Sequence, residues 1–302
     1  MSEAALTLVG SVAIPPGRTT SFDHGDVHVA SGRIFVAHTA ADSVEVVDGE
    51  SQTHLRTIAN CPEASGVLCA EEENVVFAAA RGAGKILVID ADSLVVRKEV
   101  ASGPRPNGLA WDDRRKVLLT ADVLDFSARL LDPRSGETVG QAELPGRPRW
   151  CIYDRRGDRF LVNVSEPPCV AVLTADPFGL TASWQVSSPG PHGLDLDLRR
   201  RRAFVACDGG QVLALDLASG CQVASTRIPG APDAIWFNSM RGLLYVALGR
   251  PGLVEVIDTA AMRHDAALVT GAGAHTTAFD QSRQQLAVFL PATCRVGLYR
   301  YV

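Results

Sequence analysis

The chain has 302 residues, of which 46% are hydrophobic and 21% charged, and its formal net charge is −5. This much apolar material can bury a large core without disulfides or metals. The negative balance disfavours a surface built to neutralise phosphates, so we expect no nucleic-acid partner, and the one basic run, Arg199 to Arg202, falls where a tight turn is expected.

The N-terminal residues MSEAALTLVGSVAIPPG lack the basic start and the unbroken apolar stretch of a signal peptide. No segment approaches the roughly 20 apolar residues of a membrane span. We therefore expect a cytoplasmic protein with no membrane partner. Seven cysteines include no Cys-x-x-Cys, and an odd number cannot all pair within one chain, so free thiols are expected.

A unit of about 40 residues recurs along the chain, and such a period with several short strands is typical of propeller blades. Each unit opens on a polar residue and continues as two alternating strands, as in HGLDLDLRRRRAFVAC. The first residues of the seven units are His24, Ser65, Asn107, Arg149, His192, Asp233 and His275. They are 41, 42, 42, 43, 41 and 42 positions apart.

A third strand of the form V-x-V-I-D follows in most units. Examples are SVEVVD ending at Asp48, KILVID at Asp90, QVLALD at Asp216 and LVEVID at Asp258, with β-branched alternation. A fourth strand, such as THLRTIA or CQVASTRI, leads into a Pro/Gly turn. The pattern predicts four-stranded antiparallel blades.

The seventh unit ends at RVGLYRYV after three strands, whereas the N-terminal segment ALTLVGSVAIPPG has the pattern of a fourth strand. We therefore expect one all-β domain over residues 1–302, a seven-bladed β-propeller. The N-terminal strand is expected to join the last blade and close the ring, which leaves no large open sheet edge.

The V-x-V-I-D third strands and the P-x-G-L segments at 106–109 and 191–194 resemble those of the YVTN-repeat, or YncE-like, seven-bladed propellers. The resemblance covers the whole chain. It implies the fold, while the activities of that group range over lactonases, lyases and binding scaffolds. The segment PHGLDLD is also similar to repeats of the virginiamycin B lyase group, whose catalytic histidine lies at a comparable strand start.

The turn before strand one and the turn between strands two and three fall on the same end of a four-stranded meander. One mouth of the central channel is therefore the candidate site. Five of the surrounding first residues can move protons or bind a metal: His192, Asp233, His275, His24 and Ser65. The other two, Asn107 and Arg149, offer hydrogen bonds or positive charge. This division suits a small polar, anionic or carbonyl-bearing ligand.

The first unit departs from the repeat at Asp26 and His28, where the other units carry mostly apolar residues. Strand alternation predicts that His24, Asp26 and His28 share one face. They are either ligand-binding groups or a satisfied internal pair in which Asp26 orients a neighbouring histidine. The two histidines start about 13 Å apart and cannot form one chelate.

A divalent metal would need ligands from different blades. His24, His192 and His275 can provide them, as in carotenoid-cleaving propellers that hold iron with histidines from several blades; the alternative is three unmetallated histidines. His38, at the end of a second strand, is expected beside the same mouth as a ligand-binding residue. Four further arginines lie at this end without an assigned role: Arg81, Arg105, Arg147 and Arg250.

Two motifs carry little weight. Ser65 beside His24, with Asp23 or Asp26 behind it, permits a nucleophilic triad, but no Gly-x-Ser-x-Gly marks a nucleophile elbow. The Gly-rich segment at 81–85 is expected to join two strands, unlike a phosphate-binding loop.

Two functions remain open. In the first, the protein is a hydrolase or lyase that uses His275 or His192 as base, Asp233 to orient it, and Arg149 with Asn107 to hold the developing oxyanion. A metal held by the same histidines would instead activate water. In the second, it is a non-catalytic ligand- or protein-binding scaffold. Three histidines at equivalent positions favour the enzyme, with lactone hydrolysis or β-elimination as the reaction type.

Overall fold

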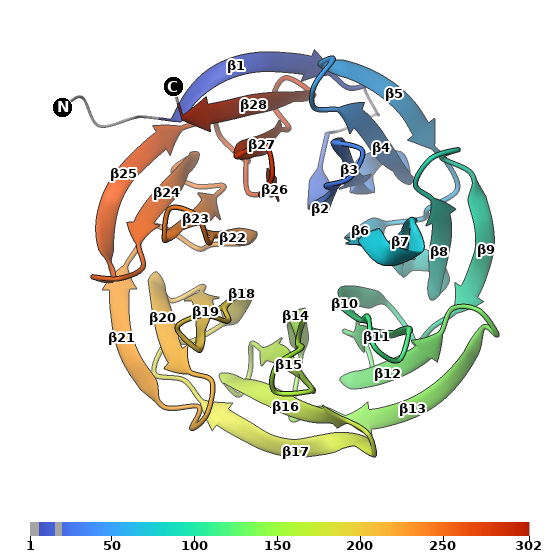
Figure 1. Ribbon diagram of the computed structural model, residues 1–302, viewed down its shortest axis with the longest axis vertical. Coiled ribbons are helices and arrows are strands. Elements are labelled where there is room, and N and C mark those ends of the chain that lie inside the picture. Colours follow the sequence, from blue (N-terminus) through green and yellow to red (C-terminus); the bar gives the residue numbers. More distant parts are fainter. Residues whose placement is uncertain (1–5, 16–19, 302) are drawn as a thin grey trace.

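The computed structural model describes residues 6–15 and 20–301, and within them the chain forms seven antiparallel sheets of four strands each. Figure 1 looks down the axis of the ring and shows the seven sheets arranged as blades around a common centre. Side chains of the first strands line a channel there. The predicted all-β, seven-bladed propeller is thereby confirmed.

Each blade runs from a first strand beside the channel to a fourth strand at the rim. The first strands are β2 (Phe22–His28), β6 (Ala64–Ala70), β10 (Pro106–Asp112), β14 (Pro148–Asp154), β18 (Pro191–Asp197), β22 (Ile235–Asn238) and β26 (Thr277–Asp280). The second strands are β3 (Arg33–His38), β7 (Val75–Ala80), β11 (Val117–Asp122), β15 (Arg159–Val164), β19 (Arg202–Cys207), β23 (Leu243–Leu248) and β27 (Gln285–Leu290).

The third strands are β4 (Ser43–Asp48), β8 (Lys85–Asp90), β12 (Ser127–Asp132), β16 (Cys169–Ala175), β20 (Gln211–Asp216), β24 (Leu253–Asp258) and β28 (Arg295–Tyr301). The fourth strands are β5 (Thr53–Ile58), β9 (Val96–Ala101), β13 (Glu137–Glu143), β17 (Phe178–Gln185), β21 (Gln222–Arg227), β25 (Arg263–Val269) and β1 (Leu6–Ala13). Three short 3₁₀ turns, η1 (Thr39–Ala41), η2 (Glu71–Glu73) and η3 (Arg81–Ala83), connect strands in the first two blades.

The N-terminal strand closes the ring. β1 pairs antiparallel with β28, from Leu6 opposite Tyr301 to Ala13 opposite Arg295, and becomes the fourth strand of blade seven. The predicted closure is confirmed. The expectation about a signal peptide rests partly on residues 1–5 and 16–17, which lie outside the described residues.

Hydrophobic cores form between neighbouring blades. Successive residues of a strand point to opposite faces, so β3 sends Phe35 toward blade two and sends Ile34 and Val36 toward blade seven. All three side chains are essentially inaccessible to solvent. A second or third strand therefore needs apolar residues on both faces, which is why runs such as RIFVA and SVEVV are nearly continuous.

Carboxylates organise the turns. Asp216, the last residue of a V-x-V-I-D strand, accepts hydrogen bonds from the backbone N–H groups of Ala218 and Ser219 at 3.0 and 2.9 Å. Asp112, at the end of a first strand, does the same for Arg114 and Arg115. The aspartates that recur in the repeat are thus turn residues.

The basic run begins, as predicted, in a turn, because residues 198–201 connect β18 to β19. All seven cysteines are free thiols. No helix in residues 6–15 and 20–301 is long and apolar enough to cross a membrane.

Candidate functional site

Strand pairing shifts the first unit by one residue relative to the sequence alignment. Phe22 pairs with His38 as Ala64 pairs with Ala80, and Gly25 pairs with Val36 as Val67 pairs with Ala78. The equivalent of Ser65 is therefore Asp23, and His24 takes the place of Gly66. The sequence alignment put His24 at the first position because its His-Gly pair matches the His-Gly pair at residues 192–193. That alignment was wrong, because the hydrogen-bonded pairing of the strands puts Asp23 at this position.

With the blades aligned by strand pairing, equivalent positions form two rows of residues around the channel. The anchor row consists of Asp23, Ser65, Asn107, Arg149, His192, Asp233 and His275. The inner row, one residue further along each blade, consists of His24, Gly66, Gly108, Trp150, Gly193, Ala234 and Thr276. A Cβ on Gly108 would lie 2.4 Å from the carbonyl oxygen of Arg149, so glycine here lets adjacent first strands approach closely.

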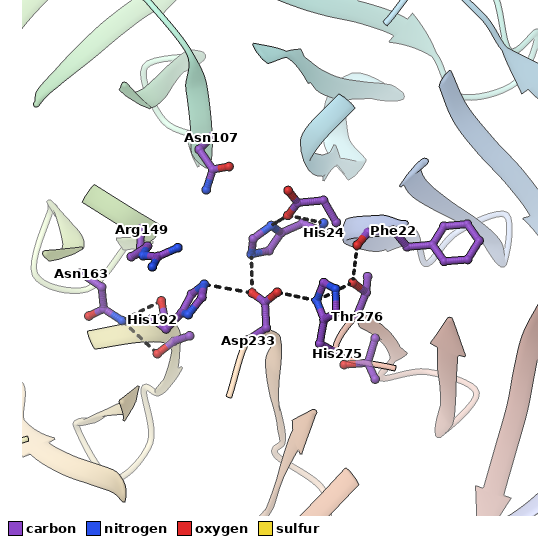
Figure 2. Close-up of polar contacts among 12 residues, drawn as sticks. Phe22, His24, Asn107, Arg149, Asn163, His192, Asp233, His275 and Thr276 are labelled. Carbon is purple, nitrogen blue, oxygen red and sulfur yellow. Dashed lines mark hydrogen bonds and ion pairs between the residues drawn. The ribbon is translucent and has the colours of Figure 1, made fainter. Parts of the chain in front are cut away.

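Asp233 is the centre of the candidate site, as Figure 2 shows. Its Oδ2 lies 2.6 Å from Nδ1 of His275, and its Oδ1 lies 3.2 Å from Nε2 of His192. His24 approaches the same Oδ1 with Nε2 at 3.8 Å. The structure thus brings together all four residues expected to be catalytic, with the carboxylate between the three imidazoles.

The three histidines differ in which ring nitrogens are engaged. Nδ1 of His24 lies 2.6 Å from Asp23, and Nδ1 of His192 lies 3.0 Å from Asp208. Both rings are therefore held at each end by a carboxylate. His275 is engaged by Asp233 only through Nδ1, and its side chain is 35% exposed. Among the described contacts its Nε2 has no partner, so it is the histidine placed to exchange a proton with a ligand.

The electrostatics follow from these contacts. Burial alone lowers the pKa of His192, but the charge of Asp233 and hydrogen bonds with Asp208 and Asp233 outweigh it and raise the pKa to about 9. The hydrogen bond that His275 donates to Asp233 raises the pKa of His275. Burial raises the pKa of Asp233, yet the positive charge of His192 and the hydrogen bonds from His192 and His275 hold that pKa well below its usual range.

A cationic group lies on the other side of the mouth. The positive charge of Arg149, followed by burial and the charge of Arg105, lowers the pKa of Arg147. Arg149 has one carboxylate near it, that of Asp208 at 3.8 Å, and its buried Nε has no hydrogen-bond partner in the described residues. Asn107 accepts a hydrogen bond from Arg81 at 3.0 Å.

Two predicted ligand residues lie elsewhere. His38 is fully buried inside blade one, where its Nδ1 faces Glu45 at 3.4 Å and its ring packs on Phe22, so it does not line the mouth. His28 ends β2, the position of the turn-capping aspartates, and bonds Ser31 at 2.9 Å. It lies at the opposite end of the channel from His24. The expected placement of His38 beside the mouth was wrong because strand position does not reveal which way a side chain is turned. His28 was expected on the face shared with His24 and Asp26, and its place at the far end of β2 leaves it outside the group at the mouth.

Ser65 is also buried, and its hydroxyl donates to the carbonyl oxygen of Pro106 at 3.0 Å. It contacts none of the three histidines, so the structure gives no support to a triad. Asp26 lines the channel two residues below His24, and it has a counterpart, Asp195, at the same position of blade five. An aspartate at this position is therefore not unique to blade one, because blade five also carries one.

The predicted metal site does not fit the donors. Among the residues that the structure describes, no group of three or more His, Cys, Asp and Glu side chains is arranged to hold a metal ion. His24, His192 and His275 surround Asp233 instead, and carboxylates engage both ring nitrogens of two of them. The metal remains a prediction.

Sequence reasoning missed Asp23, Asp208 and Arg81 as parts of the network. Arg81 approaches Asp23 at 3.4 Å and so joins the histidine group to Asn107. The sequence alignment was shifted by one residue in the first unit, so Asp23 was not recognised as the equivalent of Ser65. Asp208 follows the second strand of blade five at the same end of the channel, and its position there was the available signal.

The fold and the site define a seven-bladed β-propeller with ionisable groups converging at one end of the channel. No family model matches the chain, and no curated protein matches it. Among solved structures, a chain from the crystal structure of a mitotic checkpoint complex superposes with a TM-score of 0.83 at 11% identity, over 99% of this chain and 93% of that chain. At this identity the likeness shows the fold alone.

Proposed function

We propose that this propeller is a ligand-binding protein that takes a small anionic molecule at the anchor-row end of its channel. The observation that carries the proposal is the arginine group. Arg147 and Arg149 lie close enough for the charge of one to lower the pKa of the other. The charge of Asp208 opposes this effect, but in the described part of the chain Arg147 forms no ion pair with a carboxylate. An anion would relieve the repulsion and gain charge-assisted hydrogen bonds.

The ligand class follows from the donors around this group. A guanidinium presents a planar fork that matches a carboxylate or a phosphate. Arg149 is 24% exposed, which leaves it accessible from the mouth, and its Nε lacks an acceptor. The carboxylates of Asp23, Asp208 and Asp233 would repel an anion, but each faces a histidine or an arginine. A small monocarboxylate or phosphate fits best.

The test is calorimetric titration at low salt with lactate, acetate and inorganic phosphate. We expect Arg149→Met and Arg147→Met to weaken binding about tenfold or more, which is about 1.4 kcal/mol. Arg199→Met, on the turn at the opposite end, is the matched control and should bind normally. If none of the three anions binds, or if the control loses as much affinity as the mouth variants, the proposal is wrong.

A second candidate is an acid–base enzyme, and the free Nε2 of His275 favours it. Asp233 fixes the ring through Nδ1, so Nε2 can accept a proton from water attacking a lactone, or from a carbon acid in a β-elimination. Asp233 would stabilise the imidazolium that forms. Turnover of a lactone panel that is abolished in His275→Gln and retained in His264→Gln would support this candidate.

The solved neighbour comes from a protein assembly, which fits the binding alternative better than an enzyme. Kinship with the YVTN-repeat propellers is also a proposal, and it rests on the V-x-V-I-D third strands such as β8 and β24. A cytoplasmic location likewise remains a prediction from the sequence.

A further inference from the structure

A cavity of about 290 Å³ lies inside the channel, below the site at the mouth. His24, with 7% of its surface exposed, reaches across the ring from blade one and stacks on Trp150 of blade four. This stack lies at the anchor-row end of the cavity, where Asp233 also lines it. Three of the four tryptophans of the chain line the cavity, together with aliphatic side chains: Trp111, Trp150 and Trp236.

Three carboxylates line this aromatic cavity. One is Asp233, which faces the histidines at the mouth, and the other two are Asp26 and Asp195. Asp26 accepts hydrogen bonds from the backbone N–H groups of Val27 and of Cys69 in the next blade, both at 2.8 Å. Asp195 repeats the arrangement in blade five, with N–H groups of Leu196 at 2.7 Å and Phe237 at 2.6 Å. Each oxygen therefore accepts one hydrogen bond and retains a further lone pair.

Asp26 and Asp195 lack a cationic partner among the described residues. Within the described ranges no lysine, arginine or histidine forms an ion pair with Asp26 or Asp195. Burial raises the pKa of Asp26 to about 7, and the charges of Glu71 and Asp195 add to the rise. Burial likewise raises the pKa of Asp195 to about 6. Buried charges in proteins are normally paired, so the cavity lacks a positive partner.

The cavity can be reached from the end opposite the mouth. A second hollow opens among the turns that follow the first strands, where Glu71 and Arg199 lie. The two hollows share four residues: Asp26, Cys69, Asp195 and Trp236. A ligand can therefore meet the two carboxylates without passing the His24–Trp150 stack.

We propose that this cavity binds a small organic cation, a protonated amine carried on an aromatic or other flat apolar body. The ammonium would donate to Asp26 and Asp195, and the apolar body would lie against the tryptophan faces, which attract cations through their π-electrons. The anion site proposed at the mouth is built on Arg147 and Arg149, which do not line this cavity, while Asp233 borders both sites.

A further polar group in the cavity wall lacks a partner. The indole N–H of Trp111 is buried and has no acceptor among the described residues, whereas that of Trp236 donates to the carbonyl oxygen of Thr277 at 2.9 Å. Such groups are rare in native structures and normally have an acceptor. An amine that also carries a hydroxyl or carbonyl oxygen would supply one.

Tryptophan fluorescence tests the proposal, because ligand in the cavity alters three of the four emitters. The probes are benzylamine and phenethylamine, with phenyltrimethylammonium as a cation that cannot donate a hydrogen bond and 2-phenylethanol as a neutral analogue. We expect the two amines to change the emission saturably and to bind at least about tenfold more tightly than 2-phenylethanol.

Asp26→Asn and Asp195→Asn should each weaken amine binding about tenfold or more, since asparagine retains the shape and an acceptor but loses the charge. Glu137→Gln, on the exposed strand β13, is the matched control. Trp111→Phe should also weaken binding, and it keeps the proposal testable if an aspartate variant does not fold.

Several results would overturn the proposal: no amine binds at millimolar concentration, the alcohol binds as tightly as the amines, or both asparagine variants bind amines normally. Anion titration of the same variants separates the two sites. Cavity variants should retain anion binding, and Arg149→Met should retain amine binding.

Discussion

The ring of His24 lies face to face on the ring of Trp150, with centroids 4.0 Å apart and planes 6° from parallel. The two residues occupy the same row of blades one and four, where three other blades carry glycine. The small residues leave room at the axis of the ring, and this pair fills it. The pair consequently lies at the boundary between the polar mouth and the aromatic cavity, where Asp233 borders both.

Replacing His24 by alanine should uncover Trp150. We expect acrylamide to quench the tryptophan fluorescence of His24→Ala more strongly than that of the wild type, because Trp150 loses the ring that covers it. The lost stacking should cost about 1 kcal/mol of stability. His264→Ala, on the exposed strand β25, serves as control. Equal quenching of His24→Ala and wild type would show that His24 does not cover Trp150.

Replacing Asp233 by asparagine should change the titration of two histidines. Without this charge the pKa of His192 should fall from about 9, and that of His275 should fall as well. Histidine resonances followed by NMR between pH 5 and pH 10 measure both. Asp258→Asn, at the end of β24 in the same blade, should leave both pKa values unchanged. An unchanged His192 would mean that Asp208 alone sets its pKa.

The same variant should alter the pH dependence of stability. A histidine with a raised pKa in the folded state contributes stability that is fully present below its unfolded pKa and is lost as the pH rises through the folded value. The wild type should therefore lose stability between about pH 6.5 and pH 9. Urea unfolding at these two pH values should show a smaller loss for Asp233→Asn.

The cavity carboxylates should act on stability at lower pH. Because the folded-state pKa of Asp26 is raised to about 7, the folded protein binds more protons than the unfolded chain between about pH 4 and pH 7. The contribution of Asp26 to stability therefore falls as the pH rises through that range. The negative charges of Glu71 and Asp195 face Asp26 and add to the rise of its pKa. Asp26→Asn should become more stable relative to the wild type as the pH rises from 4.5 to 7.5, as judged by thermal melts. A constant difference would contradict the raised pKa.

Glycine in the inner row should not tolerate a side chain. In Gly108→Ala the new Cβ would meet the backbone carbonyl of Arg149 at 2.4 Å, so the first strands of blades three and four must separate. We expect a loss of about 1–3 kcal/mol, typical of overpacking. Gly179→Ala is the control, because a Cβ added at this glycine would have no heavy atom within 4 Å. Chemical denaturation of both variants gives the comparison, and equal stability would mean that the strands can move apart freely.

The sequence by itself determined the blade count, the four strands of each blade and the closure by the N-terminal strand. These features are local, because a strand is specified by its own alternating apolar residues and this pattern recurs in each of the seven units. The convergence of His192, Asp233 and His275 was also predictable, because equivalent positions of a closed ring must face one another.

Only the tertiary structure decided the frame of blade one and the orientation of individual side chains. Register depends on hydrogen bonds to the neighbouring strand, so Asp23 rather than His24 became the equivalent of Ser65. The burial of His38 against Glu45 depends on which blade face its side chain joins. The stack of His24 on Trp150 joins blades that are distant in sequence and meet only when the ring closes, and no local pattern specifies such a contact.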